Sequence, residues 1–527
     1  MKLNLESIKD TDSWKGYHLP QFDVAAMCEA TKKNPTWLHF GSGNIFRAFL
    51  CAVAQHLLES GDLTTGITCA ESFGTEIITE CFRPNDNLSV AVTLNPDGNI
   101  SKEVLGSIGE SLTTKFDMDR ITEVFCAPTL QMVSFTITEK GYAIKDMAGE
   151  FIPVIKEDMA AGPDGCKHLM SLMAALCIKR MHACGKPLAL VSMDNCSHNG
   201  EKIQLAVTAI ADAWLANGKI TAEENAYLKN QVSYPWSMID KITPRPDASV
   251  EAALEADGIE GIKPFVTPNG TYIAPFVNAE RPQYLVIEDK FPNGRPCLDK
   301  AGVIFTDRDT VNKVEKMKVC TCLNPLHTAL AIFGCLLEHT SIAKEMDDTE
   351  LNNLVRKMSA TEGLPVVVNP GIVDPKAFLD EVLNERFPNP FMPDTPQRIA
   401  TDTSQKLPIR YGEALMAHAK KGDVDTLTLM PLVLAGWLRY ILAVDDNGNA
   451  FEPSADPLLA DSQAKMQGIT FGMTDVTAEQ LKPLLGNKVI FGVDLYEIGL
   501  ADKITAYFNE LNAGAGAIRA TLKKYVD

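Results

Sequence analysis

The sequence lacks the features that mark several large classes of protein. It has no N-terminal apolar core of the length that a secretory signal needs, and no run of about eighteen apolar residues that could span a membrane. Its formal net charge is −19, which argues against a nucleic-acid groove or an anionic membrane surface as the main partner. These absences favour a cytoplasmic protein that acts on a small molecule, and they leave an anionic substrate open because cations can gather locally.

The sequence also lacks the spacing of a disulfide framework or a zinc site. Its thirteen cysteines are scattered in a way that is typical of reduced thiols. Cys320 and Cys322 form a C-x-C, but no second pair of cysteines or histidines follows at zinc spacing. His39, His198 and His327 are far apart in the chain. We therefore expect no metal, and zinc-dependent alcohol oxidation is the weaker alternative.

The chain is 527 residues long, enough for more than one domain. In its first part, short apolar strands alternate with helices, which is typical of a mostly parallel sheet covered on both faces. Beyond about residue 300, helical periodicity dominates. The sequence therefore predicts an α/β fold, with a Rossmann-like doubly wound domain over 1–300 and a mostly α-helical domain over 301–527. The first 35 residues are expected to form an irregular arm, and the predicted strands after the first two cover 88–94, 132–138 and 188–193.

A glycine-rich turn follows the first predicted strand, WLHF at 37–40. The turn, GSGNIF, leads into a helix predicted over 46–58. Strand, turn and helix form the setting of a dinucleotide site, because glycines allow close backbone approach and the helix N-terminus faces the pyrophosphate. Phe46 replaces the third glycine of G-x-G-x-x-G, so a plain strand-to-helix turn stays an alternative. The candidate cofactor residues here are Gly41, Gly43, Asn44, Ile45 and Phe46.

The second predicted strand, 66–72, ends near Glu71. A carboxylate at this place can bind the ribose hydroxyls of NAD and repel the extra phosphate of NADP. The alternative is a solvated glutamate at a strand end. Ser72 and Thr75 would tolerate a phosphate, so the preference for NAD over NADP is an expectation that rests on Glu71.

The segment 315–337, EKMKVCTCLNPLHTALAIFGCLL, gathers polar residues at the head of an apolar run. Lys318 can give or take a proton, and Asn324 can donate a hydrogen bond from a neutral amide. His327 shares a helix face with Asn324. Such a set suits proton-coupled redox or elimination chemistry at an alcohol carbon. The alternative is a buried helix with polar residues at its N-terminus. Asn195, after the strand at 188–193, is likewise either a donor at a sheet edge or a turn asparagine.

Seven segments, in order from about residue 37 to 410, carry a family resemblance. They are HFGSGNIFRA, TEKGY (138–142), DNCSHNG (194–200), SMIDKITP (237–244), EDKFPNGRP (288–296), EKMK with LNPLH, and RIATDTSQK (398–406). The chain resembles the polyol-specific long-chain dehydrogenases, the mannitol dehydrogenase family, which also includes reductases of the sugar acids fructuronate and tagaturonate. The chain length and the NPLHTALAIFGCLL segment look more like the branch that interconverts D-mannonate and D-fructuronate.

The resemblance implies a metal-independent, NAD-dependent oxidation of a secondary alcohol, in a cleft between the two domains. Lys318 matches the family's general base. Asn195 and Asn324 match asparagines that stabilise the developing oxyanion, and His327 matches a histidine that orients the substrate. Three further residues match polar groups that line the substrate cleft: Asp240, Arg398 and Lys406.

One departure from the family pattern concerns the spacing of the base. Lys318 and Asn324 are six residues apart, whereas the family pattern has five. The resemblance thus implies a one-residue insertion within 319–323, which a helix absorbs by a bulge or a shifted start. The insertion leaves Lys316 as an alternative base. Pro325 also departs from the pattern, and it is acceptable in the first turn of a helix.

The substrate stays open among three pairs: mannonate with fructuronate, altronate with tagaturonate, and mannitol or another polyol with its ketose. Arg398, Lys406, and also Arg410 or Arg47, could pair with a hexonate carboxylate, which favours a charged substrate. The same cations can hydrogen-bond polyol hydroxyls. An alternative of another class is a nucleotide-sensing protein that kept the fold and lost catalysis. The sequence does not reveal the oligomeric state.

Overall fold

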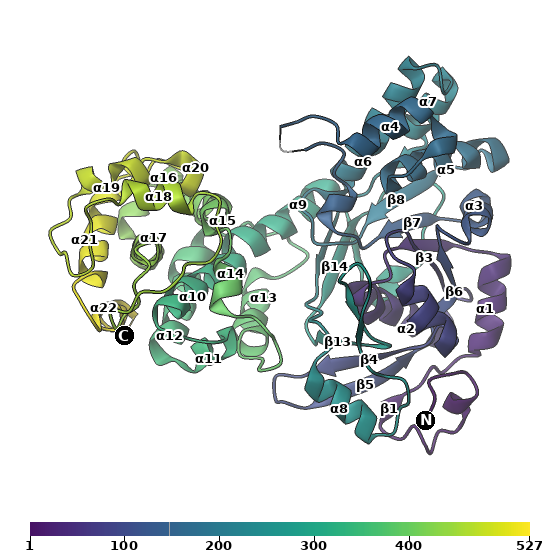
Figure 1. Cartoon of the computed structure of the whole chain (residues 1–527), viewed down its shortest axis with the longest axis horizontal. Coiled ribbons are helices and arrows are strands. Elements are labelled where there is room, and N and C mark those ends of the chain that lie inside the picture. The colour runs from purple at the N-terminus through teal and green to yellow at the C-terminus, as the bar shows by residue number, and fades with distance from the viewer. Residues whose placement is uncertain (147, 527) are drawn as a thin grey trace. The chain divides into compact units, whose positions relative to one another are not determined.

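The structure, a computed structural model, describes residues 1–146 and 148–526. The chain forms two compact units. The first contains Met1–Asn95 and Asn99–Asn312, and the second contains the chain from Lys313 onward together with Pro96–Gly98. Each unit has its own secondary structure, mixed α/β in the first and helical in the second (Figure 1).

The first unit is built on a parallel sheet. Within the described residues this sheet has six strands in the order β6-β3-β2-β7-β8-β9, and every neighbouring pair runs parallel. The chain order reverses between β2 and β7, which is the switch point where ligands bind in such sheets. The strands are β2 (Trp37–Phe40), β3 (Ile67–Glu71), β6 (Ile108–Thr113), β7 (Met132–Phe135), β8 (Leu188–Ser192) and β9 (Val232–Ser233).

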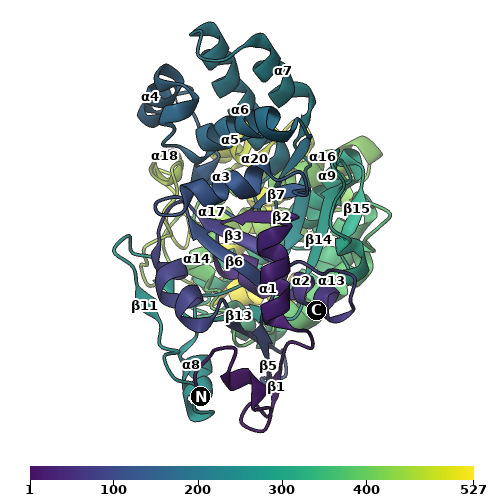
Figure 2. The ribbon, with the colours of Figure 1, turned by 90° about the vertical axis from the view of Figure 1, so that its right-hand side faces the viewer.

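Helices cover both faces of this sheet, which confirms the predicted doubly wound fold. Leu38 and Phe40 pack into one core with helices α3, α5 and α6, while Trp37 packs into a second core with η2 and α2. Alternate side chains of one strand thus enter different cores. Figure 2 shows β7, β2, β3 and β6 side by side. The helices of this unit are α1 (Val24–Lys33), η2 (Phe46–Cys51), α2 (Ala52–Glu59), η3 (Ile77–Phe82), α3 (Met118–Cys126), α4 (Pro153–Ala161), α5 (Leu169–Cys184), α6 (Asn199–Ala216), α7 (Ala222–Asn230) and α8 (Ala248–Ala256).

Two details of the predicted first domain are wrong. The expected irregular arm contains α1, because the Asp23 side chain caps the helix by accepting from the Ala26 N–H, and Lys32 and Lys33 stabilise its C-terminal end. The strand expected at 88–94 is β4 (Ser89–Leu94), but it pairs antiparallel with β5 (Ile100–Leu105) in a separate mixed sheet. The remaining strands are β1 (Tyr17–His18), β10 (Ser237–Asp240), β11 (Phe265–Val266), β12 (Tyr272–Ile273), β13 (Phe276–Glu280), β14 (Tyr284–Glu288) and β15 (Ile304–Thr306).

The second unit is helical, as predicted. Its core contains α10 and α17, whose side chains are apolar and buried nearly all round. Near its C-terminal end the chain forms two helices, α21 (Ala501–Leu511) and α22 (Ala517–Val526), separated by a turn in which Gly514 and Gly516 have positive φ. The helices are α11 (Ile342–Asp347), α12 (Thr349–Met358), α13 (Pro375–Glu381), η11 (Val382–Arg386), α14 (Pro396–Ala400), α15 (Thr403–Leu407), η12 (Pro408–Gly412), α16 (Glu413–Lys421), α17 (Leu429–Tyr440), α18 (Leu459–Lys465), α19 (Ala478–Leu485), α20 (Lys488–Phe491), α21 (Ala501–Leu511) and α22 (Ala517–Val526).

One continuous helical stretch, Arg308–Leu336, contains α9 (Arg308–Met317), a π-helical turn η8 (Lys318–Cys322) and α10 (Asn324–Leu336). A π-helical turn holds one residue more than an α-helical turn. By length and composition this stretch would cross a membrane, but 83% of its apolar window is buried inside the protein, which is typical of a core helix.

Candidate active site

The glycine-rich turn follows β2 and is held in a conformation that only glycine adopts easily. Gly41 has a φ of +99°, and a Cβ on it would lie 2.2 Å from the carbonyl oxygen of Thr136. In contrast, a Cβ on Gly43 would meet nothing within 4 Å. Gly41 therefore shapes the turn, whereas Gly43 leaves open space in front of it.

His39 supports this turn from its buried side, a role that the sequence analysis missed. Its Nδ1 hydrogen-bonds Ser134 Oγ at 2.6 Å, and its Nε2 lies 2.9 Å from Thr136 Oγ1 and 3.1 Å from the Gly41 carbonyl oxygen. Burial lowers the pKa of His39 to about 3, so the ring is neutral. The Phe46 ring stacks on it at 4.2 Å. The phenylalanine in place of a third glycine thus packs beneath the turn, and the only sequence signal was a histidine inside an apolar strand.

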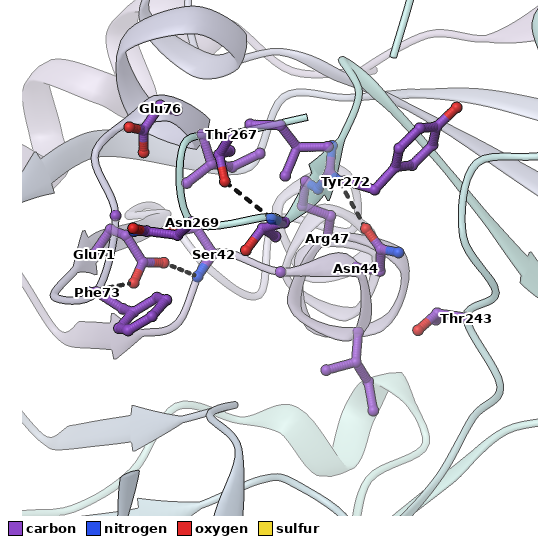
Figure 3. Close-up of a pocket in the computed structure, with 16 residues that line it drawn as sticks. Ser42, Asn44, Arg47, Glu71, Phe73, Glu76, Thr243, Thr267, Asn269 and Tyr272 are labelled. Carbon is purple, nitrogen blue, oxygen red and sulfur yellow. Dashed lines mark hydrogen bonds between the residues drawn. The ribbon is translucent and has the colours of Figure 1, made fainter. Parts of the chain in front are cut away.

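A cavity of about 380 Å³ opens over the turn (Figure 3). Of the six predicted cofactor residues, Gly43, Asn44, Ile45 and Glu71 line the cavity. The hairpin of β11 and β12 supplies another part of its wall, with Thr267, Asn269, Thr271 and Tyr272 among the lining residues.

The Glu71 carboxylate is fixed at the carboxyl end of β3. Its Oε2 accepts a hydrogen bond from the Ser42 N–H at 3.0 Å. Its Oε1 accepts from the N–H groups of Ser72 at 2.9 Å and Phe73 at 3.1 Å. Three backbone donors hold the carboxylate against the cavity, which differs from the solvated glutamate that the sequence left as an alternative.

Arg47 brings a buried positive charge to the same cavity. Its Nη1 donates to the Ala274 carbonyl at 2.7 Å, and its Nη2 donates to Asn44 Oδ1 at 2.9 Å. These partners are neutral, so no carboxylate among the described residues neutralises the guanidinium. Burial lowers the pKa of Arg47. The terminal nitrogens of Arg47 therefore link parts of the cavity wall around the glycine-rich turn. A hexonate carboxylate is no longer the expected partner of Arg47.

A hydrogen bond next to Asn195 joins two of the seven segments, TEKGY and DNCSHNG. The Tyr142 hydroxyl donates to Asp194 Oδ2, and its oxygen lies 3.0 Å from Ser192 Oγ. Asp194 is buried, and burial raises its pKa. Asn195 follows it as an exposed residue on the loop after β8. In the same unit, Asp240 is the last residue of β10 and is buried.

In the second unit, Lys318 is the first residue of the π-helical turn η8. It is only 5% exposed. Lys316, in contrast, has a side chain that is 47% exposed and lies 3.9 Å from Glu413. Asn324 starts α10, and Leu323 separates it from the turn. The segment 319–323, in which the resemblance implies an insertion, thus consists of four residues of the π turn and Leu323.

His327 lies on the same helix and faces a buried acid. Its Nε2 lies 3.5 Å from Asp394 Oδ2, and Asp394 also pairs with the Arg398 guanidinium. Burial lowers the pKa of His327 to about 4, although Asp394 acts in the opposite direction. The imidazole is therefore neutral near pH 7.

Two further cations lie beside these residues. Lys406 Nζ donates to the carbonyl oxygens of Ile399, at 3.1 Å, and Thr401. Burial, together with nearby Arg410, lowers the pKa of Lys406 to about 8. Arg410, which the sequence named only as one option for a carboxylate partner, donates from Nη1 to Thr328 Oγ1 at 2.6 Å. The carboxylates of Asp394, Asp402 and Asp456 also act on this part of the second unit, but of the three cations only Arg398 pairs with one of them among the described residues.

The described residues, 1–146 and 148–526, contain no group of three or more His, Cys, Asp or Glu side chains placed to hold a metal ion. All thirteen cysteines are described, and all are free thiols.

Comparison with known proteins places the chain in a family. Residues 35–300 match the family model of the mannitol dehydrogenase Rossmann domain, and residues 310–512 match that of the mannitol dehydrogenase C-terminal domain. The chain belongs to the mannitol dehydrogenase family. The resemblance drawn from the seven sequence segments is thereby confirmed.

Individual relatives cover nearly the whole chain. The chain is 49% identical to the D-mannonate oxidoreductase of Thermotoga maritima, over 100% of this chain and 99% of that protein. It is 28% identical to the polyol:NADP oxidoreductase of Gluconobacter oxydans, over 85% of this chain and 87% of that protein. The solved structure of Pseudomonas fluorescens mannitol 2-dehydrogenase, a ternary complex with NAD and D-mannitol, matches with a TM-score of 0.72 at 25% identity, over 99% of each chain.

As a member of the mannitol dehydrogenase family, this chain is an NAD(P)-dependent oxidoreductase that acts on a sugar acid or a polyol. The enzymatic interpretation therefore replaces the alternative of a protein that only senses a nucleotide.

Proposed function

We propose that the chain interconverts D-mannonate and D-fructuronate with NAD, without a catalytic metal. The observation that carries the choice of substrate is the group of cations Arg398, Lys406 and Arg410 around Asn324 and His327. Among the described residues, only Arg398 of the three pairs with a carboxylate. Cations without a carboxylate partner favour a substrate with a carboxylate over a neutral polyol. The 49% identical relative named for D-mannonate supports the same choice.

The residues of the first unit fit a dinucleotide. Gly43 leaves room for close approach to the turn, the helix that follows presents its N-terminal N–H groups, and buried Arg47 adds an unneutralised positive charge. These features suit a pyrophosphate, and Glu71 suits the ribose next to it. When bound, the nicotinamide accepts the hydride from the alcohol or returns it to the ketone.

Lys318 is proposed as the general base. In the oxidative direction its amine takes the hydroxyl proton, and in the reverse direction its ammonium returns a proton to the ketone oxygen. The burial of Lys318 and the exposure of Lys316 support this choice of lysine. The π turn that starts at Lys318 supports the view that the helix accommodates the additional residue without displacing the base.

The amides of Asn195 and Asn324 are proposed to donate hydrogen bonds to the reacting oxygen. One such donor typically stabilises the transition state by about 3 to 4 kcal/mol. Neutral His327 can both donate to and accept from a substrate hydroxyl, and its buried Nε2 has no hydrogen-bond partner among the described residues. Asp240, Arg398 and Lys406 are proposed to hold the remaining polar groups of the sugar acid.

NAD is proposed as the preferred nucleotide because the fixed Glu71 carboxylate would repel a 2′-phosphate. The family also contains a relative named for NADP, so the comparison of NADH with NADPH is part of the test. The free thiols support a reducing compartment, and we propose that the enzyme is cytoplasmic.

The direct test is the loss of NADH absorbance with D-fructuronate, D-tagaturonate and D-fructose as substrates. We expect the highest kcat/KM with fructuronate, and a lower value with NADPH than with NADH. Faster reduction of tagaturonate or fructose would replace the proposed substrate. Binding of NADH without turnover of any of the three would show that the substrate is another sugar acid or polyol.

The base is tested with a matched pair of lysines two residues apart. Lys318→Ala should lower kcat by roughly 10²- to 10⁴-fold, the usual contribution of a general acid or base, while the NADH dissociation constant stays nearly unchanged. Lys316→Ala should leave kcat close to the wild-type value, because its side chain is largely exposed. A collapse of turnover in Lys316→Ala, but not in Lys318→Ala, would move the base to Lys316.

A further inference from the structure

We propose that Arg410 is the residue that recognises the substrate carboxylate and thereby determines the preference for a sugar acid over a polyol. This inference rests on the proposed function and adds a specificity-determining residue to it. Arg410 lies four residues beyond the RIATDTSQK segment of the family resemblance. The resemblance gave it no role, and the sequence named it only as one option, beside Arg47, for a carboxylate partner.

Arg410 is held rigidly against the start of α10. It lies in the π-helical turn η12, and its Nη1 donates to Thr328 Oγ1 at 2.6 Å and lies 3.5 Å from the Asn324 carbonyl oxygen. The next residue, Tyr411, donates its hydroxyl to the Pro325 carbonyl at 2.7 Å. Two consecutive side chains thus tie η12 to the first turn of α10, where Asn324 and His327 lie.

The hydrogen bonds of Arg410 to the described residues leave one edge of its guanidinium unused. Both of its hydrogen bonds come from Nη1, and no described residue accepts from Nε or Nη2. The edge formed by Nε and Nη2 has the planar two-donor geometry that matches a carboxylate. Because Thr328 fixes Nη1, the plane of this edge is set before a substrate arrives.

The other two cations of the group are already engaged within the protein. The Arg398 guanidinium pairs with Asp394, which neutralises much of its charge. Lys406 donates to two backbone carbonyl oxygens and has a pKa of about 8, so part of its population is neutral at that pH. Arg410 has no carboxylate partner among the described residues and stays charged at neutral pH, since burial lowers its pKa only to about 10.

The place of Arg410 also matters for selectivity. The guanidinium lies beside Asn324, because its Nη1 is 3.5 Å from the Asn324 carbonyl oxygen, and the Asn324 amide is proposed to serve the reacting oxygen. A polyol would place a neutral hydroxymethyl group there and leave a largely buried charge without a counterion. A charge-assisted hydrogen bond contributes about 1.5 to 3 kcal/mol, so the discrimination is expected to be on the order of 10- to 100-fold.

The test is the ratio of kcat/KM for D-fructuronate to kcat/KM for D-fructose, measured on one preparation of enzyme. The ratio does not depend on the folded fraction, so a variant that folds poorly still gives an answer. Arg410→Met should lower the ratio by about 10- to 100-fold through loss of fructuronate reduction. Arg410→Lys keeps the charge without the two-donor edge and should give an intermediate ratio.

Two further variants separate recognition from general effects. Thr328→Val removes the hydroxyl that fixes Nη1 and should lower the ratio less than Arg410→Met does. Lys420→Met removes an equal charge from an exposed position of α16 and should leave the ratio unchanged. Arg410→Met should also keep the wild-type dissociation constant for NADH, because the cofactor residues belong to the first unit.

A ratio within twofold of the wild-type value in Arg410→Met would overturn the inference, as would an equal loss of activity on both ketones. Calorimetry of D-mannonate and D-mannitol with the enzyme and NADH gives the same comparison without turnover. One combination of results separates the inference from the proposed function. If the wild-type enzyme binds mannonate and Arg410→Met weakens that binding at least tenfold, the inference stands. If the same wild-type enzyme does not reduce fructuronate, the proposed function fails. If the wild type neither binds mannonate nor reduces fructuronate, both fail.

Discussion

Lys406 shows how burial and neighbouring charges change a single side chain. An exposed lysine is protonated at all physiological pH values, but burial and the positive charges of Arg410 and Arg398 lower the pKa of Lys406 to about 8. Asp402 and Asp456 act in the opposite direction and do not compensate. A bound carboxylate would favour the charged form, so affinity for an anion and protonation of Lys406 are coupled.

This coupling predicts a pH-dependent affinity. Below about pH 8 Lys406 is charged, so the dissociation constant of D-mannonate for the enzyme with NADH should be constant. It should rise by up to tenfold per pH unit above that value. Lys406→Arg, which stays protonated, should remove the rise. Calorimetry between pH 6.5 and 9.5 measures this without involving the chemical step. A flat profile in the wild type would contradict a role for Lys406 in binding.

Glu345 is a second residue whose surroundings decide its charge. It lies in the core of the second unit, and neither carboxyl oxygen has a hydrogen-bond partner in the part of the chain that the structure describes. It packs against Gly334, where a Cβ would lie 1.9 Å from Oε1. Burial, and to a smaller extent Asp348, raise the pKa of Glu345 well above its usual value. The thiol of Cys335 also lies near this carboxyl group.

A raised pKa has a defined consequence for stability. The folded state keeps the proton of Glu345 above pH 4.5, where the unfolded chain loses it, so the stability that this proton provides is lost as the pH rises toward the folded pKa. Glu345→Gln cannot ionise. The melting temperature of the variant minus that of the wild type should therefore increase from pH 5 to pH 8. Thermal unfolding followed by circular dichroism measures it, and a constant difference would show that Glu345 is ionised in the folded protein.

At the scale of the elements, the segment 37–59 forms a strand, a turn and a helix. Its turn contains two glycines, Gly41 and Gly43, which are needed for different reasons. The positive φ of Gly41 and the close carbonyl of Thr136 are requirements of the fold, whereas the space in front of Gly43 is a requirement of a ligand. Substitutions at Gly41 and Gly43 can therefore distinguish an effect on folding from an effect on cofactor binding.

Gly41→Ala should destabilise the protein by about 2 kcal/mol or more, because alanine is strained at this φ and its Cβ would clash with a backbone oxygen. Gly43→Ala should leave the melting temperature unchanged and weaken NADH binding by roughly tenfold, since its Cβ would enter the cavity. Thermal unfolding and NADH fluorescence titration measure the two effects. Unchanged NADH affinity in Gly43→Ala would argue against a cofactor at this turn.

At the scale of the whole molecule, the proposed ligands divide between the two units. The proposed cofactor residues belong to the first unit, and the proposed general base and the cations belong to the second. Ligand protection in hydrogen exchange should follow this division, because a bound ligand suppresses local opening where it binds.

NADH alone should protect amides in peptides that contain 41–46, 71–77 and 265–273. D-Mannonate added to the NADH complex should extend protection to 318–328 and 398–410. Hydrogen exchange with mass spectrometry measures both steps on the intact chain. Protection by NADH confined to the helices of the second unit would contradict the proposed location of the cofactor.

The sequence by itself determined the fold class and the family, because both depend on local patterns. The alternation of apolar strands with helices predicted the doubly wound sheet, and seven ordered segments indicated the mannitol dehydrogenase family. The burial of Lys318 within a π turn agrees with the position that motif matching assigned to the base, although the role itself stays a prediction.

Only the tertiary structure decided which partners each polar side chain has. Arg47 lies in the first of the seven segments and Arg410 lies just beyond the last. From the sequence alone, the two were equal options for binding a substrate carboxylate. The fold directs Arg47 to backbone carbonyls 227 and 229 residues away, and fixes Arg410 through Thr328, 82 residues away. Likewise, only packing reveals that Phe46 stacks on His39 beneath the turn and that Glu345 has no partner. Such contacts join residues distant in the chain, and no local pattern encodes them.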